Sequence, residues 1–189
     1  YWHSEIGANK NKNYHLTKTE QCIEKNIQLI HIFEDEWIEK QDIVKSIIKS
    51  KLGIIDKKIY ARKCQIKKID TKEANLFLFE NHIQGPIISG ENLGLYYKDQ
   101  LVSILTVGKS RFSNKYDFEI LRFCNKLDTI VIGGFSKLLK EFSGKNRFKS
   151  IISYCDIRYS NGKLYQKYGF NTIDKSSPNY YYMDSNYNR

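Results

Sequence analysis

Two features that the 189-residue sequence lacks exclude whole classes of protein. It has no run of about 18 apolar residues, so nothing in it predicts a transmembrane helix. It also has no Cys-x-x-Cys spacing, and its cysteines stand far apart within apolar stretches. That arrangement favours free buried thiols in a reducing compartment over a zinc site. The four cysteines are Cys22, Cys64, Cys124 and Cys155.

The sequence begins at Tyr1 rather than at methionine, and no signal-peptide pattern stands at its start. We therefore expect a cytoplasmic protein, and we expect this chain to be a piece of a longer one. Its length suits one domain of ordinary size, or one domain with a fragment of another. Its 41% hydrophobic residues suffice for a core.

The net charge of +10 is the most informative feature of the composition. Residues 1–57 hold nine Lys/Arg and nine Asp/Glu, whereas residues 58–189 hold twenty-two and twelve. The excess therefore lies entirely in the later part, where it favours DNA as a partner because cations release counterions from backbone phosphates. A Lys-rich, AT-biased proteome is the alternative explanation. The oligomeric state is left open.

In the first part, residues 13–25 have the composition of a helix and residues 28–33 that of a short strand. The carboxylates of residues 34–36 suit the solvated N-terminus of a helix. An apolar stripe then predicts a further helix that ends at Gly53. The stripe consists of Ile43, Val44, Ile47 and Ile48.

Three strings in this part carry a resemblance: YWHSE (1–5), YHLTK (14–18) and NIQLIHIFEDEW (26–37). They resemble the back half of the very-short-patch-repair-type nucleases, a branch of the PD-(D/E)XK fold. They are similar in particular to the EDxHD, Hef-like homing endonucleases of phages. The resemblance implies a DNA endonuclease that uses Mg²⁺ in a phage-infected bacterial cytoplasm. It also implies site roles for His3, His15 and Lys18.

In that family the metal-binding acidic residues lie on elements before the Tyr-Trp-His string, and this chain has no such elements. Without them we predict no metal site. We expect residues 1–57 to be a truncated nuclease piece with little or no cleaving activity.

Residues 58–189 show an alternation of strands and helices that predicts an α/β (α+β) domain, a mixed sheet flanked by helices. Strands are expected at residues 59–66, 92–97, 100–107, 116–124 and 151–155, and two more within 170–183. Lys98-Asp99 predicts a tight hairpin turn. Helices are expected after a capping box at Asp70 and Glu73, after Gly133-Gly134, and from Asn161, a candidate N-cap, to Gly169.

The strings LYQKYGF (164–170) and ISYCDIRYSNGKLYQKYGF (152–170) carry a second resemblance. They look like the corresponding parts of the GNAT acyltransferases and of their relative, the phage DNA-modification protein Mom. The resemblance implies that Tyr165 protonates a leaving thiolate and that Asp156 or His82 takes the proton of an amine. It implies further that acetyl-CoA is held by Gly133, Gly134, Ser136 and Asn161. Alternatively, Tyr165 is core and His82 caps a helix.

A basic loop at residues 108–115 surrounds an aromatic side chain and suits contact with a nucleic acid. A base could stack on Phe112 while cations hold phosphate, although an ordinary surface loop has the same composition. The predicted DNA-contacting residues are Lys109, Arg111, Phe112, Lys115 and Arg158. We therefore expect a DNA-binding protein of the homing-endonuclease type. The alternatives are an acyl-CoA-dependent acyltransferase acting on a nucleobase, and a binding module without chemistry.

Overall fold

The structure is a computed structural model that describes residues 13–176. The chain divides into two compact units. The described part of the first unit consists of residues 13–39 and 156–176, and the second unit consists of residues 40–155. The predicted boundary between residues 57 and 58 thus falls within the second unit. The YWHSE string, and with it the predicted site residue His3, lies outside the described residues.

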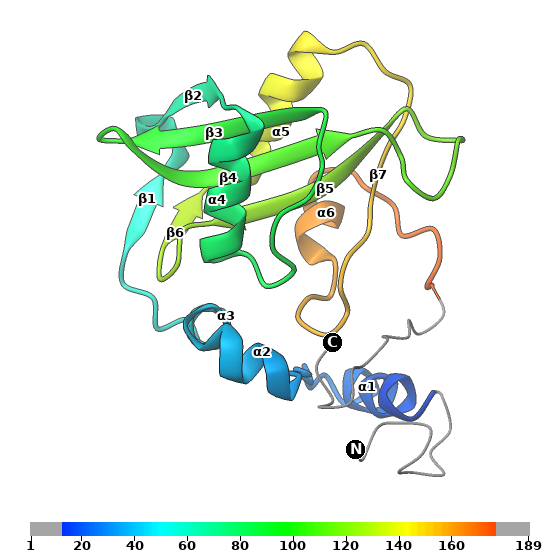
Figure 1. Ribbon diagram of the computed structural model, residues 1–189. Coiled ribbons are helices and arrows are strands. Elements are labelled where there is room, and N and C mark those ends of the chain that lie inside the picture. Colours follow the sequence, from blue (N-terminus) through cyan, green and yellow to red (C-terminus); the bar gives the residue numbers. More distant parts are fainter. Residues whose placement is uncertain (1–12, 177–189) are drawn as a thin grey trace. The chain divides into compact units, whose positions relative to one another are not determined.

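The second unit is built around a five-stranded sheet with the strand order β2-β3-β4-β5-β7 (Figure 1). Its neighbouring strands are antiparallel except for β5 and β7, which are parallel. β1 and β6 form a separate parallel pair. The predicted mixed α/β architecture is confirmed. The strands are β1 (Lys58–Tyr60), β2 (Gln65–Lys68), β3 (Glu91–Tyr97), β4 (Gln100–Gly108), β5 (Phe118–Asn125), β6 (Ile130–Ile132) and β7 (Ile151–Ser153).

The single strand predicted over residues 59–66 is wrong, because a 3₁₀ turn, Ala61–Lys63, separates β1 from β2. The turn lets Ala61 and Cys64 both be buried. On a continuous strand, side chains three positions apart would point to opposite faces. β6, the partner of β1, is missing from the prediction, because a three-residue strand gives too short a pattern to separate it from the following helix.

The predicted hairpin between β3 and β4 is confirmed. The two strands pair from Tyr97 opposite Gln100 to Glu91 opposite Val107. The turn residues Lys98 and Asp99 have φ values of 49° and 59°. Positive φ at both central residues is the requirement of a type I′ turn, whose twist matches that of the flanking strands.

A bulge in β5 sets which of its side chains reach the helix behind it. The pairing passes from Arg122 opposite Thr106 to Ile120 opposite Val107, which leaves Leu121 without an opposite residue. Phe118 and Phe123 are five positions apart and would otherwise face opposite sides. With the bulge both contact α5 (Gly134–Lys145), Phe118 through Phe142 and Phe123 through Phe135.

Helices α4 (Thr71–Asn81) and α5 cover opposite faces of the sheet (Figure 1). The carboxylate of Asp70 accepts the Glu73 N–H at 2.8 Å, which confirms the predicted cap. The other half of the predicted capping box is wrong, because Glu73 accepts a hydrogen bond from the Tyr96 hydroxyl instead. Under α4 lies a core cluster consisting of Ile69, Ala74, Phe77, Leu78, Ile104 and Cys124.

Helix α3 (Gln41–Leu52) ends at Gly53, whose φ of 73° confirms the predicted left-handed stop.

Burial of Cys124 in the core raises the pKa of its thiol to about 12, in line with the predicted role of a buried hydrophobic thiol. None of the helices within residues 13–176 has the length and apolar character needed to cross a membrane.

The first unit contains α1 (Tyr14–Glu24), α2 (Glu34–Glu39) and α6 (Lys163–Lys167). The strand predicted at residues 28–33 is wrong. Those residues form neither helix nor strand, and the His31 N–H donates to the Arg158 carbonyl at 3.2 Å. No strand forms at residues 170–176 either, and the rest of the strand pair predicted there lies outside the described residues.

Candidate functional site

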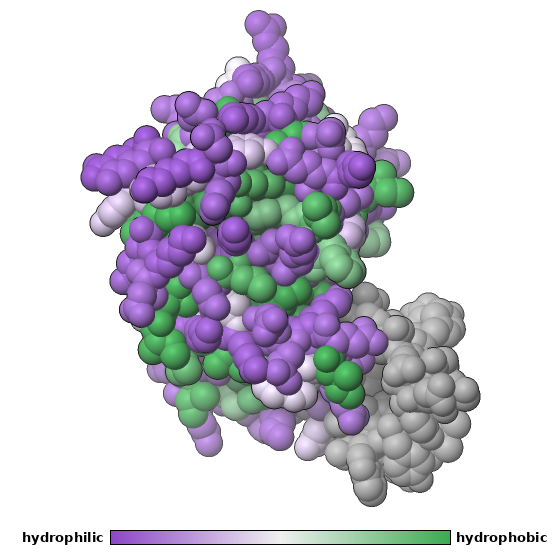
Figure 2. Space-filling view, turned by 60° about the vertical axis from the view of Figure 1, so that its left-hand side comes forward, coloured by the Kyte–Doolittle hydropathy of each residue, from purple (hydrophilic) through white to green (hydrophobic). Residues whose placement is uncertain are grey.

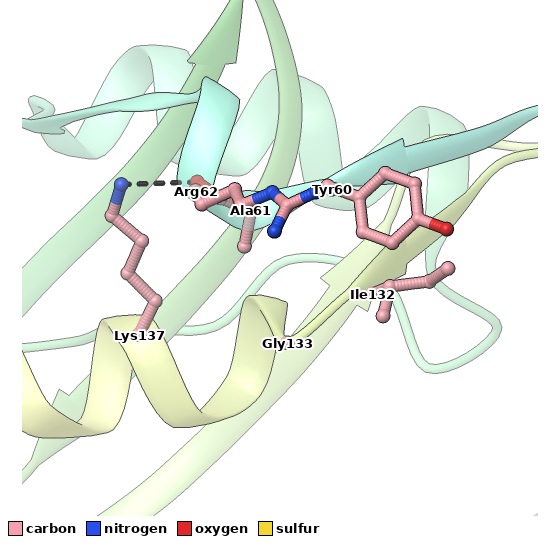
Figure 3. Close-up of a pocket in the computed structure, with 6 residues that line it drawn as sticks. All are labelled: Tyr60, Ala61, Arg62, Ile132, Gly133 and Lys137. Atoms are coloured by element: carbon pink, nitrogen blue, oxygen red, sulfur yellow. Dashed lines mark hydrogen bonds between the residues drawn. The ribbon is translucent and has the colours of Figure 1, made fainter.

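The chain enters α5 beside an open depression of ≈ 510 Å³ (Figure 3). β6 ends at Ile132, and Gly133 then takes a φ of 77°, a conformation that costs glycine little and turns the backbone into the helix. Tyr60, Ala61 and Arg62 line the opposite side. The site thus places a helix N-terminus, where backbone N–H groups and the helix dipole favour anions, next to a guanidinium.

Lys137 is fixed at this depression by the backbone of the 3₁₀ turn. Its Nζ donates to the carbonyl oxygens of Ala61 at 3.0 Å and Cys64 at 2.6 Å, and Figure 3 shows it reaching from α5 to the turn. On the other side of the turn, the guanidinium of Arg62 lies 5.1 Å from the ring centroid of Tyr60. The Tyr60 ring is 46% exposed, so an aromatic and two cations are presented together.

A second depression of ≈ 460 Å³ continues along α5 and shares Lys137 with the first. We call the two depressions together the α5 groove. Their lining residues are Tyr60, Ala61, Arg62, Ile66, Ile132, Gly133, Lys137, Lys140, Glu141, Gly144 and Lys145. Lys145 is bonded to Glu141 at 2.6 Å, and that bond raises the pKa of its ammonium group.

Positive charge is concentrated beside this groove. Residues 57–68, which run through β1, the 3₁₀ turn and β2, contain six Lys/Arg and no Asp/Glu. In Figure 2, which brings the side of β1 and β2 forward, hydrophilic side chains cover most of that face and hydrophobic ones show between them. The six residues are Lys57, Lys58, Arg62, Lys63, Lys67 and Lys68.

The basic loop predicted at residues 108–115 is a loop between β4 and β5. Its Arg111 donates to Glu119 from the backbone N–H at 2.9 Å and from the guanidinium Nη2 at 2.6 Å. Glu119 is completely buried. The loop also carries Lys109, Phe112 and Lys115, and all three of these are exposed. Arg111 therefore anchors the loop to the buried Glu119 as well as carrying a positive charge.

The predicted cofactor residues of the second unit lie at the ends of its helices. Gly134 is buried against Val131, 3.1 Å from the position of an added Cβ, so a larger residue would crowd the core. The Ser136 hydroxyl donates back to the Gly133 carbonyl at 3.3 Å. His82 follows the last residue of α4. Its backbone N–H donates to the Leu78 carbonyl, and its Nδ1 accepts the Gln84 N–H at 3.1 Å.

The remaining predicted site residues belong to the first unit, so neither unit contains the whole set implied by the acyltransferase resemblance. Tyr165 packs edge to face on Phe170 at 5.6 Å. Gly162, not Asn161, occupies the N-cap position of α6, because its φ of 74° suits glycine and Asn161 accepts the Lys163 N–H from one position earlier. Gly169 has the predicted positive φ, 86°.

Arg158 is held by two carboxylates of the first unit. It donates to Asp156 at 2.9 Å and to Glu36 at 3.0 Å, and its side chain is 16% exposed. Both Phe33 and Tyr159 lie 4.7 Å from the guanidinium. Like Arg111, which pairs with Glu119, Arg158 therefore already has carboxylate partners within its own unit.

Glu36 is buried, so the solvated role predicted for residues 34–36 is wrong at this position. It accepts hydrogen bonds from the Tyr159 hydroxyl, the Phe33 N–H and Arg158. Burial alone would raise the pKa of Glu36, but these three bonds outweigh it and leave the pKa below its ordinary value. A buried acid with an arginine partner distant in the sequence has no local signature.

His15 and Lys18 lie on α1, and a third residue, His31, joins them although the sequence prediction missed it. The rings of His15 and His31 meet edge to face at 5.4 Å. His31 Nε2 lies 2.7 Å from the hydroxyl oxygen of Thr19, which is buried. The sequence pattern assigned His31 to a strand at residues 28–33, and that assignment gave no reason to place it beside α1.

No group of three His, Cys, Asp or Glu side chains within residues 13–176 is arranged to hold a metal ion. The described residues therefore do not fit the Mg²⁺ implied by the nuclease resemblance. Comparisons with protein-family models, curated proteins and solved structures found no match for this chain.

Proposed function

We propose that this chain is a DNA-binding protein of the homing-endonuclease type and that the α5 groove holds the DNA backbone. The observation that carries the proposal is the joining of two open depressions through Lys137 along one helix, beside a segment with six cations and no acid. A merely Lys-rich surface explains the charge but not two joined depressions lined by Arg62, Lys137 and Lys140.

The dimensions and chemistry of the groove suit a polynucleotide. α5 has 12 residues, and a helix of that length spans about 18 Å. Lys and Arg along such a track displace condensed counterions from phosphates, and this supplies most of the affinity in binding without sequence preference. Tyr60 adds an exposed ring at the end of the track, where a base or sugar can pack.

The proposal is tested by removing three exposed charges that line the groove. In the triple variant Arg62→Gln, Lys140→Gln, Lys145→Gln we expect the Kd for a labelled DNA duplex, measured by fluorescence anisotropy, to rise by about 10- to 100-fold. The matched control removes the same charge elsewhere in the second unit, through Lys45→Gln, Lys72→Gln and Lys126→Gln, and should change Kd several-fold less. Equal losses in both variants would show that only net charge matters and would refute the groove.

A second candidate function, acyl transfer from acetyl-CoA to a nucleobase amine, is favoured by a different observation. β5 and β7 are a parallel pair at one side of an otherwise antiparallel sheet, and the strand-to-helix passage at Gly133 opens onto the depression that Arg62 lines. A pyrophosphate would suit that helix N-terminus. Calorimetric titration with acetyl-CoA should then give saturable binding that Arg62→Gln weakens. No heat at millimolar ligand would eliminate this candidate.

A further inference from the structure

The loop between β4 and β5, residues 109–117, is held by the buried carboxylate of Glu119, which does not line the α5 groove. Glu119 accepts three hydrogen bonds from Arg111: the backbone N–H at 2.9 Å, Nε at 3.0 Å and Nη2 at 2.6 Å. The Glu119 side chain is 1% exposed and that of Arg111 38%. A buried ion pair with both carboxylate oxygens occupied fixes the loop in one conformation.

The far end of the same loop is also tied down. The carboxylate of Asp117 accepts the Lys149 N–H at 2.7 Å and the Ser150 N–H at 3.2 Å, so the loop is fastened to the segment before β7. The Ser150 hydroxyl in turn lies 3.4 Å from the Lys115 carbonyl. Bonding at both ends means that the middle of the loop is held in place before any ligand arrives, which reduces the entropy lost on binding.

The loop carries an exposed aromatic side chain, Phe112, which contacts a second exposed aromatic, Tyr154. Phe112 is 72% exposed and meets Tyr154, which is 45% exposed, edge to face at a centroid distance of 5.3 Å. The guanidinium of Arg111 lies 5.0 Å from the Phe112 ring, and so polarises the ring and holds its orientation. Lys109 and Lys115 lie on either side along the loop. We call Phe112 and Tyr154 the aromatic platform.

We propose that the aromatic platform stacks a nucleobase that is not stacked within a duplex, so that the protein prefers DNA carrying an unpaired base over continuous duplex. This inference rests on the proposed DNA binding. Bases inside an intact duplex already have both faces covered, whereas a bulged or single-stranded base offers a free π face to an exposed ring. The flanking lysines supply cations for the phosphates beside that base. Glu119 is the positioning residue that holds the platform.

The experiment compares three labelled DNAs by fluorescence anisotropy at one salt concentration: a continuous duplex, the same duplex with one unpaired nucleotide, and the single strand. We expect wild-type protein to bind the last two more tightly than the first. Phe112→Ala should weaken binding to those two by about 5- to 100-fold, the range for one base stacked on an aromatic side chain, and leave the continuous duplex unchanged. Phe79→Ala is the matched control, since Phe79 is 68% exposed on α4.

Two further variants separate positioning from folding. Phe112→Trp should keep the preference, and its fluorescence should fall on binding the bulged DNA but not the continuous duplex. Glu119→Gln should lose the preference while binding continuous duplex as wild type does. Phe112→Ala removes only an exposed ring, so it keeps the test valid if the thermal midpoint shows that Glu119→Gln is unfolded.

The outcomes distinguish this inference from the function on which it rests. Equal affinity for all three DNAs, or equal losses in Phe112→Ala and Phe79→Ala, would overturn the platform while leaving DNA binding intact. Absence of binding to any of the three DNAs would overturn the proposed function itself.

Discussion

The Thr19 hydroxyl selects the tautomer of the neutral His31 ring. The Thr19 hydroxyl donates its single proton to the His15 carbonyl at 2.9 Å, so at 2.7 Å it can only accept from His31 Nε2. In the neutral ring the lone pair therefore lies on Nδ1. Burial lowers the pKa of His31, the positive charges of Arg158 and Lys18 lower it further, and Asp156 partly opposes them. The ring is thus held neutral near pH 7.

This arrangement predicts a pH dependence of stability. Because the folded pKa lies below the ordinary value of 6.5, the unfolded chain takes up the proton first as the pH falls. Stability should therefore fall below pH 6.5, by less than about 1.4 kcal/mol per pH unit, until the folded pKa is passed. His31→Gln should reduce this slope.

Urea unfolding between pH 8 and pH 5, followed by tryptophan fluorescence, measures the effect, since Trp37 lies in the same unit as His31. The comparison at pH 8, where His31 is neutral in both states, provides the reference for the variant. A slope that is the same in His31→Gln and wild type would contradict the assignment.

At the scale of an element, the β3–β4 hairpin shows how a turn tolerates residues that do not suit it. A type I′ turn favours Asn-Gly, because both central residues need positive φ. Here the positions hold Lys98 and Asp99, and for such side chains a left-handed backbone costs roughly 1 kcal/mol. The long strand ladder on either side fixes the turn regardless.

Replacing the turn residues should therefore stabilise the second unit. We expect Lys98→Asn with Asp99→Gly to raise the free energy of unfolding by about 1 kcal/mol, because the new residues adopt positive φ with little strain. Lys98→Val, which is β-branched, should lower it. Thermal unfolding by circular dichroism ranks the three proteins. A double variant no more stable than wild type would show that the turn stores no strain.

At the scale of the whole molecule, the distribution of charge supports the proposed DNA binding. The excess of ten positive charges lies entirely in residues 58–189, and the α5 groove collects part of it. Counterion release makes the affinity depend on salt in proportion to the number of phosphate contacts. The slope of log Kd against log salt therefore reports the total number of phosphate contacts, which a single substitution does not.

For duplex DNA, a plot of log Kd against log salt should be steep for wild type. The triple groove variant Arg62→Gln, Lys140→Gln, Lys145→Gln should have a slope shallower by about 2.7, since each lost phosphate contact removes about 0.9. Phe112→Ala should leave the slope on duplex DNA unchanged, because an uncharged ring releases no counterions. Unequal changes in these two variants separate backbone contacts from base stacking. A groove variant with an unchanged slope would contradict the model of phosphate contacts.

The sequence by itself determined the features whose cause lies within a few residues. The cap at Asp70 and the left-handed stop at Gly53 each depend on one local bond or one backbone angle. Phe135, Leu138 and Phe142 of α5 are buried at spacings of three and four residues, as a 3.6-residue period requires. Such local signals explain why the helices could be predicted, whereas among the strands the prediction matched β3, β4, β5 and β7.

Only the tertiary structure decided which distant segments meet. Arg111 and Glu119 form an ion pair across a loop, and Glu36 meets Arg158 from 122 positions away. β1 pairs with β6 and does not continue into β2. The 3₁₀ turn between β1 and β2 can therefore bury both Ala61 and Cys64. A buried carboxylate is stable only where a cation and N–H donors surround it. Packing brings those partners together from distant parts of the chain, so the residues next to the carboxylate in the sequence do not predict them.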